Sequence, residues 1–251
     1  MTKRLAIVTG AGTSNGIGAA IAQQLVQNDF KVFIADINLA AASEVANKIA
    51  QTGGEIEAFA LDVTNQRNVK EKIKSIVDAH GPISVLVNNA GITRPTRVLE
   101  ISDEEFDLIF SVNMKGTFYM TQAVLPSMVE QNYGRIINLG SVSAKRGGGV
   151  FGGSHYSAAK GAVMSFTKAV AREMASQGIT VNSVAPGFIG TGITGDFANN
   201  PDNVKMLLET IPANRIGTVE DVAHAVCFLA SEHSGYITGE EIDINGGSHI
   251  D

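Results

Sequence analysis

A tyrosine and a lysine stand four residues apart in the segment Tyr156-Ser157-Ala158-Ala159-Lys160. On a helix this spacing is about one turn, so both side chains project from the same face. A phenol titrates near 10 in water and is a poor base at neutral pH. A fixed ammonium group beside it favours the phenolate, so we expect Lys160 to lower the pKa of Tyr156. Such a pair also occurs on ordinary helices, where the tyrosine is a core residue and the lysine is solvated.

A glycine-rich segment, Thr9–Gly18, follows the first strand-like run of the chain and precedes the first helical run. Glycines in this position permit a tight turn and let backbone amides approach a pyrophosphate at a helix N-terminus. The segment therefore predicts a dinucleotide site, with a plain flexible turn as the alternative.

Asp36 ends the second strand-like run. A carboxylate there can accept hydrogen bonds from the ribose diol of an adenosine and would repel a 2′-phosphate. No lysine or arginine lies in the glycine segment, or at Ile37 or Asn38, to offset that repulsion. The sequence therefore predicts NAD(H) rather than NADP(H), with a helix-capping role for Asp36 as the alternative.

The elements that must position these residues alternate between strand and helix, which predicts parallel strands joined by right-handed helical crossovers. The expected fold class is α/β, a single-domain Rossmann-type doubly wound parallel sheet with helices on both faces, spanning 1–251. A segment rich in Gly, Asn, Asp and Thr, at about 187–203, is expected to be a flexible substrate lid. Strands are expected at 5–9, 31–36, 56–61, 84–87, 135–139, 180–184 and 241–244. Helices are expected at 17–27, 39–51, 66–79, 104–130 (long or kinked), 156–175 and 219–231.

Composition narrows the class of partner. The chain has 251 residues, a net charge of −6 and a pI near 5.4, so no basic stripe is available for nucleic acid or an anionic membrane. Cys227 is the only cysteine and is expected to pack as a small apolar side chain, and no metal site is expected. No signal peptide or membrane-spanning run is visible, so we expect a cytoplasmic protein.

Further short motifs follow in order along the chain: Asp62-Val63, Asn88-Asn89-Ala90-Gly91, Asn113, Pro186-Gly187 and Asn245-Gly246-Gly247. Together with the glycine segment and the tyrosine–lysine pair, they resemble the short-chain dehydrogenase/reductase family over essentially the whole chain. The resemblance implies hydride transfer between nicotinamide C4 and the carbinol carbon of a small-molecule alcohol or ketone. It also implies a homotetramer, or sometimes a dimer.

The resemblance assigns roles to individual residues. Tyr156 is the acid/base, Lys160 tunes it and holds the nicotinamide ribose, and Ser141 stabilises charge on the substrate oxygen. Asn113 holds a water that links Lys160 to solvent, or bonds to backbone at a helix kink. The cofactor-binding residues implied are Gly10, Asn15, Gly16, Ile17, Gly18, Asp36, Asp62, Val63, Asn89, Ala90, Gly91, Tyr156, Lys160, Pro186, Gly187, Ile189 and Thr191.

The chain departs from the family pattern at two places. Five residues separate Gly10 from Gly16, where the family has three, so the turn should be longer; Gly10 is preferred over Gly12 as the first glycine. The family's serine stands about thirteen residues before the tyrosine, which counts to Ser143. The surrounding pattern nevertheless aligns best on Ser141, given an insertion in 147–153.

The substrate is less constrained. The segment Pro186–Ile189 and the residues near Gly239 are similar to 3-oxoacyl-carrier-protein reductases, but these generally use NADPH and carry basic residues for an acidic carrier. We therefore expect an NAD-linked dehydrogenase of a secondary alcohol, polyol or sugar, with a 3-oxoacyl-(carrier protein or CoA) reductase as the alternative. A non-catalytic NAD(H)-binding sensor or scaffold is a more distant alternative.

Several residues are candidates for the substrate pocket, namely Ser143, His155 and Phe188. A surface or packing role is the alternative for His155, and a core role is the alternative for Phe188. Lys145 and Arg146 either bind an anionic group of the substrate or are solvated surface residues.

Overall fold

The computed structural model describes residues 3–192 and 200–251, and its strands form one parallel seven-stranded sheet in the order β3-β2-β1-β4-β5-β6-β7. The order reverses between β1 and β4, and this creates a crevice at the carboxyl ends of the strands. This is the expected Rossmann-type doubly wound sheet. The strands are β1 (Leu5–Thr9), β2 (Lys31–Asp36), β3 (Ile56–Ala60), β4 (Ile83–Asn88), β5 (Gly134–Leu139), β6 (Ile179–Pro186) and β7 (Glu241–Ile244).

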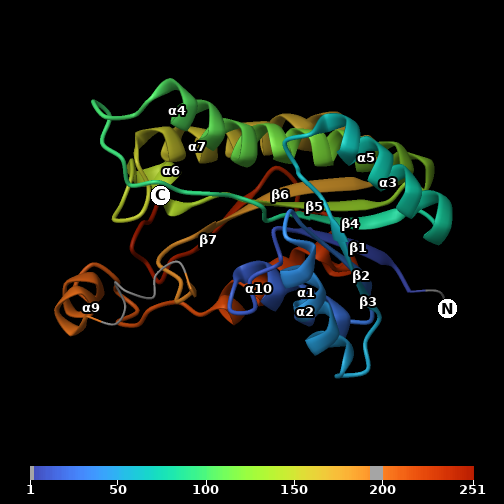
Figure 1. Ribbon diagram of the computed structural model, residues 1–251, viewed down its shortest axis with the longest axis horizontal. Helices are drawn as coiled ribbons and strands as arrows, with labels where there is room; N and C mark the ends of the chain where they lie inside the picture. The colour runs from blue at the N-terminus through green and yellow to red at the C-terminus, as the bar shows by residue number, and fades with distance from the viewer. Residues whose placement is uncertain (1–2, 193–199) are drawn as a thin grey trace.

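Helices cover both faces of the sheet (Figure 1). One face is covered by α1 (Ile17–Gln27), α2 (Leu39–Ala50) and α10 (Val219–Ala230). The other is covered by α3 (Gln66–His80), α4 (Asp103–Phe110), α5 (Gly116–Glu130) and α7 (Ser154–Met174). An apolar core lies on each side, because the central strands are buried on both faces.

The long helix expected at 104–130 is interrupted. Between α4 and α5, residues Ser111–Lys115 form a π-helical turn. Such turns insert an extra residue into the helical ladder and often occur at functional sites. Asn113 lies in this turn and is fully buried, so the kink aims its amide toward the sheet.

Two short helices were not expected. The first, α6 (Val142–Arg146), begins immediately after β5 and is capped by the side chain of Ser141, which accepts from the backbone N–H of Ser143 at 3.1 Å. Five residues show too little periodicity to be found from sequence. The second, α9 (Pro201–Leu208), lies to one side of the sheet in Figure 1.

The expected lid falls partly on residues 193–199, which lie outside the described residues. On its described part, Ile189 pairs with Gly217 in an isolated β-bridge, and residues from Pro201 onward belong to α9.

A chain of buried amides and hydroxyls fixes the central strands against the helices. Asn88 donates from Nδ2 to Asn138 Oδ1 at 2.8 Å, and Asn138 donates from Nδ2 to Thr167 Oγ1 at 2.8 Å. Buried polar groups are costly without partners, so these bonds favour one register. They tie β4 and β5 to α7, the helix that carries Tyr156 and Lys160.

The expectation that Cys227 packs as an apolar side chain is met. Cys227 packs against the core, and burial raises the pKa of its thiol to about 12. Among the described residues, no helix is both long and apolar enough to cross a membrane.

Candidate active site

A cavity of about 670 Å³ opens at the carboxyl edge of the sheet. It reaches from Asp36 at the end of β2 to Tyr156 and Lys160 on α7. Nearly all the expected cofactor residues line it. They are Gly10, Gly16, Ile17, Gly18, Asp36, Asp62, Val63, Asn89, Ala90, Gly91, Tyr156, Lys160, Pro186, Gly187, Ile189 and Thr191.

Close packing explains the first glycine of the loop. Gly10 has φ of +64°, which glycine adopts without strain, and a Cβ there would lie 2.6 Å from Ala90 Cα. Asn89 holds the loop by donating from Nδ2 to the carbonyls of Thr9 and Gly10, both at 2.8 Å. Gly10 therefore lies at the turn itself, as the sequence suggested.

Gly12 has a separate task. Its backbone N–H donates to Asp36 Oδ2 at 2.8 Å, and a Cβ on Gly12 would lie 2.8 Å from that oxygen. The other carboxylate oxygen, Oδ1, accepts from the N–H of Asn38 at 3.0 Å. The carboxylate of Asp36 is thus held in place at the cavity wall. The capping alternative is wrong, because Asn38 is the N-cap of α2 and accepts from Ala41 N.

Ser141, Tyr156 and Lys160 meet near the end of β5. Lys160 donates from Nζ to the Leu139 carbonyl at 2.6 Å, and Nζ lies 5.9 Å from the centroid of the Tyr156 ring. Burial raises the pKa of Tyr156, and a hydrogen bond with Ser141 opposes that rise. Burial also lowers the pKa of Lys160 to about 8.

The expected lowering of the tyrosine pKa is therefore wrong for this structure. Burial is the dominant influence on this pKa, and Lys160 does not counter it here, because its Nζ is directed to the Leu139 carbonyl rather than to the phenol. The structure favours a protonated phenol at neutral pH.

Asn113 completes the arrangement beside Lys160. Its Nδ2 donates to the carbonyls of Ile92 and Ile109, both at 2.9 Å, while its buried Oδ1 has no partner among the described residues. A Cβ on Gly91 would lie 2.7 Å from that Oδ1 and 3.4 Å from Lys160 Nζ. The two polar atoms thus face the same small space, where a water could bridge them.

A smaller hollow of about 140 Å³ adjoins the cofactor cavity, and both include Ser141, Tyr156 and Phe188 in their lining. Ser143 lines only the smaller hollow. Ser141 therefore lies between the two spaces and interacts with the phenol, which favours it over Ser143 as the serine that meets the substrate oxygen.

Two expected site residues lie elsewhere. Asn15 is exposed at the tip of the glycine loop, outside the cavity lining, and accepts from Ser14 Oγ at 3.2 Å. The two extra residues of that loop move its tip outward. The side chain of His155 is fully buried and its Nε2 lies 2.9 Å from Glu105 Oε1, so it links α7 to α4 rather than lining the pocket. Its neighbour Tyr156 points in a different direction, because adjacent residues on a helix are about 100° apart around its axis.

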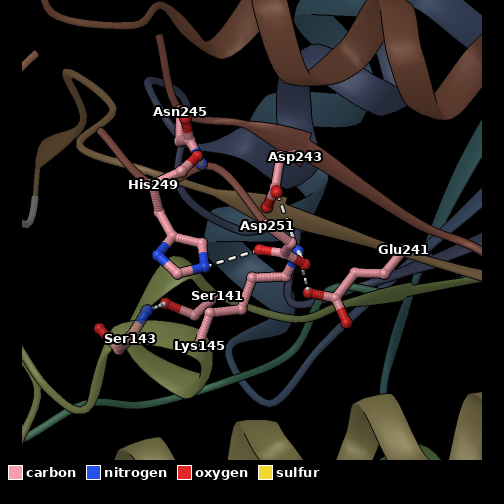
Figure 2. A network of polar contacts seen from close by, with 8 residues as sticks. All are labelled: Ser141, Ser143, Lys145, Glu241, Asp243, Asn245, His249 and Asp251. Carbon is pink, nitrogen blue, oxygen red and sulfur yellow. Dashed lines mark hydrogen bonds and ion pairs between the residues drawn. The ribbon is translucent and has the colours of Figure 1, made fainter. Parts of the chain in front are cut away.

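Lys145 lies outside the lining of both cavities, and its side chain is buried rather than solvated. Its Nζ lies 2.7 Å from Asp251 Oδ2, 2.8 Å from Asp243 Oδ2 and 3.3 Å from Glu241 Oε1, and its side chain is 9% exposed. Figure 2 shows these three carboxylates around the lysine, with His249 Nε2 bonded to the other oxygen of Asp251. Burial acts to lower the pKa of Lys145, but the three carboxylates together outweigh it and raise that pKa above its ordinary value.

Sequence reasoning missed Thr93, Phe151 and Ser248. Thr93 Oγ1 donates to the Phe151 carbonyl, and all three residues line the smaller hollow. Each lies in a loop without periodicity, so only the fold brings them to the site.

The residues present fit a nicotinamide dinucleotide. The glycine loop gives a close approach to backbone, Asp36 offers a fixed carboxylate at one end, and Asn113 offers an unpartnered acceptor near the other. The cavity between these ends is continuous.

The family model described as enoyl-(acyl carrier protein) reductase matches residues 10–249. The chain is 41% identical to the 3-oxoacyl-(acyl-carrier-protein) reductase FabG of Vibrio harveyi, over 98% of both chains. It is 39% identical to the same-named protein of Escherichia coli, again over 98% of both. A solved structure described as a gluconate 5-dehydrogenase from Burkholderia cenocepacia in complex with NADP and tartrate is 30% identical, with a TM-score of 0.92, covering 99% of this chain and 96% of that one.

The buried lysine predicts a pH dependence of stability. Its pKa falls from 10.5 in the unfolded chain to about 8 on folding, so between these values the unfolded state binds more protons. The free energy of unfolding of the wild type, relative to Lys160→Met, should therefore rise from pH 8 toward 10 by about 1 kcal/mol per pH unit. Urea unfolding at several pH values measures this. Lys72→Met, at an exposed position, should show no such trend, and a constant difference for Lys160→Met would contradict it.

The Lys145 cluster predicts a second stability effect. Lys145→Met leaves three neighbouring carboxylates without their cation and should destabilise the protein at pH 7 by roughly 2 kcal/mol. Lys145 lowers the pKa of Asp251, so this stabilisation is present above the unfolded value and is lost as pH falls through the folded one. Thermal unfolding at pH 7 and at pH 2, well below the ordinary aspartate pKa of 3.8, should show the deficit shrinking. Lys48→Met is the surface control, and an equal deficit at both pH values would refute the charge explanation.

Proposed function

Because the chain belongs to the short-chain dehydrogenase/reductase family, we propose that it interconverts a secondary alcohol and its ketone with NAD(H). One observation carries the proposal: Ser141 and Tyr156 lie in the walls of both the large cavity and the smaller hollow, with Lys160 behind them. A substrate oxygen in the hollow would meet a hydroxyl pair, while the carbon beside it faces the cavity.

The bound cofactor supplies the hydride, or accepts it, at nicotinamide C4. In the reductive direction Tyr156 gives its phenolic proton to the substrate oxygen as the adjacent carbon gains the hydride. Ser141 donates to the same oxygen and stabilises its growing charge. In the oxidative direction the phenol must first lose its proton, and the raised pKa of Tyr156 opposes that loss near neutrality.

Lys160 and Asn113 are proposed to resupply the proton. Nζ of Lys160 and Oδ1 of Asn113 face a common space next to Gly91, and a water held there would connect them. Because the pKa of Lys160 is about 8, the ammonium can exchange its proton within the neutral to mildly alkaline range.

The preference for NAD(H) rests on Asp36. Its carboxylate is fixed by Gly12 and Asn38 at the cavity wall and offers remaining lone pairs to a ribose diol. A 2′-phosphate at that position would meet a like charge. The Burkholderia structure is described with NADP, so the cofactor has to be measured on this chain directly.

Two substrate classes each have a supporting observation. The relatives named 3-oxoacyl-(acyl-carrier-protein) reductase, about 40% identical over the full length, favour a 3-oxoacyl thioester over the free polyol or sugar first expected. The structure described as a gluconate 5-dehydrogenase favours a free hydroxy compound. Oxidation of NADH with acetoacetyl-CoA, compared with reduction of NAD⁺ by gluconate and polyols, separates these classes at 340 nm. Binding of NADH without turnover of either would instead favour a sensor or scaffold.

Assembly as a homotetramer, with a dimer as the alternative, is part of the proposal. Exposed apolar side chains along α4 and α5, including Phe106, Leu108 and Phe118, support it, since such surface is commonly covered by a partner. Light scattering of the purified protein gives the mass.

Tyr156→Phe removes the proposed proton donor and keeps the ring. Turnover should fall at least about 100-fold, because general acid–base catalysis contributes on that scale, while NADH affinity changes little. Steady-state rates and NADH fluorescence titration measure the two effects. Tyr236→Phe, at a fully exposed position, is the matched control. Near-wild-type turnover of Tyr156→Phe would remove the assigned acid/base.

Asp36→Asn keeps an acceptor for the backbone amides and removes the charge. The Kd for NADPH should fall relative to that for NADH, by about tenfold or more in the ratio, because a like-charge repulsion is lost. Fluorescence titration of both cofactors measures the ratio, with Asp78→Asn as the control on the exposed end of α3. An unchanged ratio would contradict the role given to Asp36.

A further inference from the structure

Two adjacent cations at the end of α6 have different surroundings. Lys145 is enclosed by Glu241, Asp243 and Asp251, as Figure 2 shows. Arg146 is exposed and makes no ion pair with any carboxylate in the part of the chain that the structure describes. Lys145 thus engages Glu241, Asp243 and Asp251, and the guanidinium of Arg146 is left for another partner.

Arg146 lines the smaller hollow beside the proposed catalytic residues. Its Nη2 lies 3.6 Å from the point that a Cβ on Gly149 would occupy, and Ser143 Oγ lies 3.7 Å from the same point. Ser143 Oγ also lies 3.4 Å from the corresponding point on Gly152, where the Tyr156 ring carbon Cδ1 is 2.6 Å away. A polar strip therefore runs from the phenol ring past Ser143 to the guanidinium.

In the described lining of the hollow, no other charged side chain would attract or repel an anion bound at Arg146. Among the described residues that line it, Arg146 is the only charged one, and Val150, Phe151, Phe188, Leu207 and Ile211 contribute apolar surface. A volume of about 140 Å³ suits a compact molecule of a few carbon atoms. In such a space a charged group on the substrate would lie only a few bonds from the reacting carbon.

We propose that Arg146 binds the carboxylate of a compact hydroxy acid, or of its keto form, whose carbinol carbon faces Tyr156. This substrate class rests on the oxidoreductase function proposed above. A guanidinium binds a carboxylate through two parallel hydrogen bonds, and this fixes the orientation of the substrate as well as its affinity.

The carboxylate is unchanged by the reaction. On oxidation the carbinol carbon would give a hydride to NAD⁺, and the hydroxyl would give its proton to Tyr156 in its phenolate form, which then passes it to solvent, so that a ketone remains. The phosphates of a coenzyme A thioester lie at the far end of a long pantetheine arm from the reacting carbon, so they do not reach a guanidinium this close to Ser143. A neutral polyol leaves the guanidinium without a partner.

The test compares substrates that differ only in charge. Rates with NAD⁺ are measured for 3-hydroxybutyrate against its methyl ester, and for gluconate against glucitol, in the wild type, Arg146→Met and Arg146→Lys. In the wild type, the acid of at least one pair should be used with the higher kcat/KM. Arg146→Met should raise KM for that acid about 10- to 100-fold and leave the neutral partner unchanged. Arg146→Lys should restore part of the loss, because it returns a charge without the planar fork.

Controls separate this inference from the function on which it rests. Arg172→Met removes an exposed arginine on α7 and should behave as wild type, and thermal unfolding shows whether each variant folds. Turnover of an acid with a KM that Arg146→Met does not change would overturn the inference and leave the oxidoreductase function intact. The same holds if only acetoacetyl-CoA is turned over. Glycerol 3-phosphate is the last compound tested. If Arg146→Met raises KM for this compound alone, the group that Arg146 binds is a phosphate rather than a carboxylate, and the inference is overturned. Binding of NADH with no turnover of any compound would sink both proposals.

Discussion

The burial of a lysine ammonium at the carboxyl edge of the sheet is the constraint around which the site is arranged. Lys160 is 5% exposed, and its ammonium donates a hydrogen bond to the Leu139 carbonyl. Keeping a charge there costs free energy, which is why its pKa falls to about 8. The π-helical turn at Ser111–Lys115 offsets part of that free-energy cost, because it places the side-chain oxygen of Asn113 next to the same space as the ammonium. The proton exchange proposed for Lys160 thus takes place where burial of the ammonium costs stability.

The other end of the cavity is built by mutual restraint between backbone and side chains. Asp36 binds the amide of Gly12, while Asn89 binds the carbonyls of Thr9 and Gly10. Each contact joins segments that are distant in sequence, so the loop that would receive a pyrophosphate is held from β2 and from β4. The sheet therefore sets the distance between the end of the cavity at Asp36 and the end at Tyr156 and Lys160. Neither end depends on a flexible side chain for its position.

Much of this could be predicted from the sequence, for a physical reason. Strands buried on both faces are apolar runs, and the amphipathic helices between them have a clear period, so the alternation and the sheet follow. Glycines and an aspartate at the ends of strands mark the edge where sites form in such sheets. The pKa of Tyr156 could not be obtained in this way. Its direction depends on how burial compares with a charge whose distance and orientation only the three-dimensional packing fixes. For the same reason the sequence left His155 open between a pocket role and a packing role: adjacent positions on a helix point in different directions, and only the structure shows that this one packs against Glu105.

The insertion before Tyr156 shows that substrate specificity, too, depends on packing that the sequence alone does not predict. Extra residues in 147–153 leave the catalytic spacing intact because the loop folds outward, with Gly147 and Gly148 at positive φ, and returns at Gly152 against the Tyr156 ring. The loop thereby becomes a wall of the smaller hollow. At its start, the last carboxylates of the chain converge on Lys145. That contact both anchors α6 and removes the negative charges that would otherwise compete for Arg146. The smaller hollow thus has one cationic wall, formed by Arg146. A sequence comparison of the catalytic motifs alone would not reveal this wall.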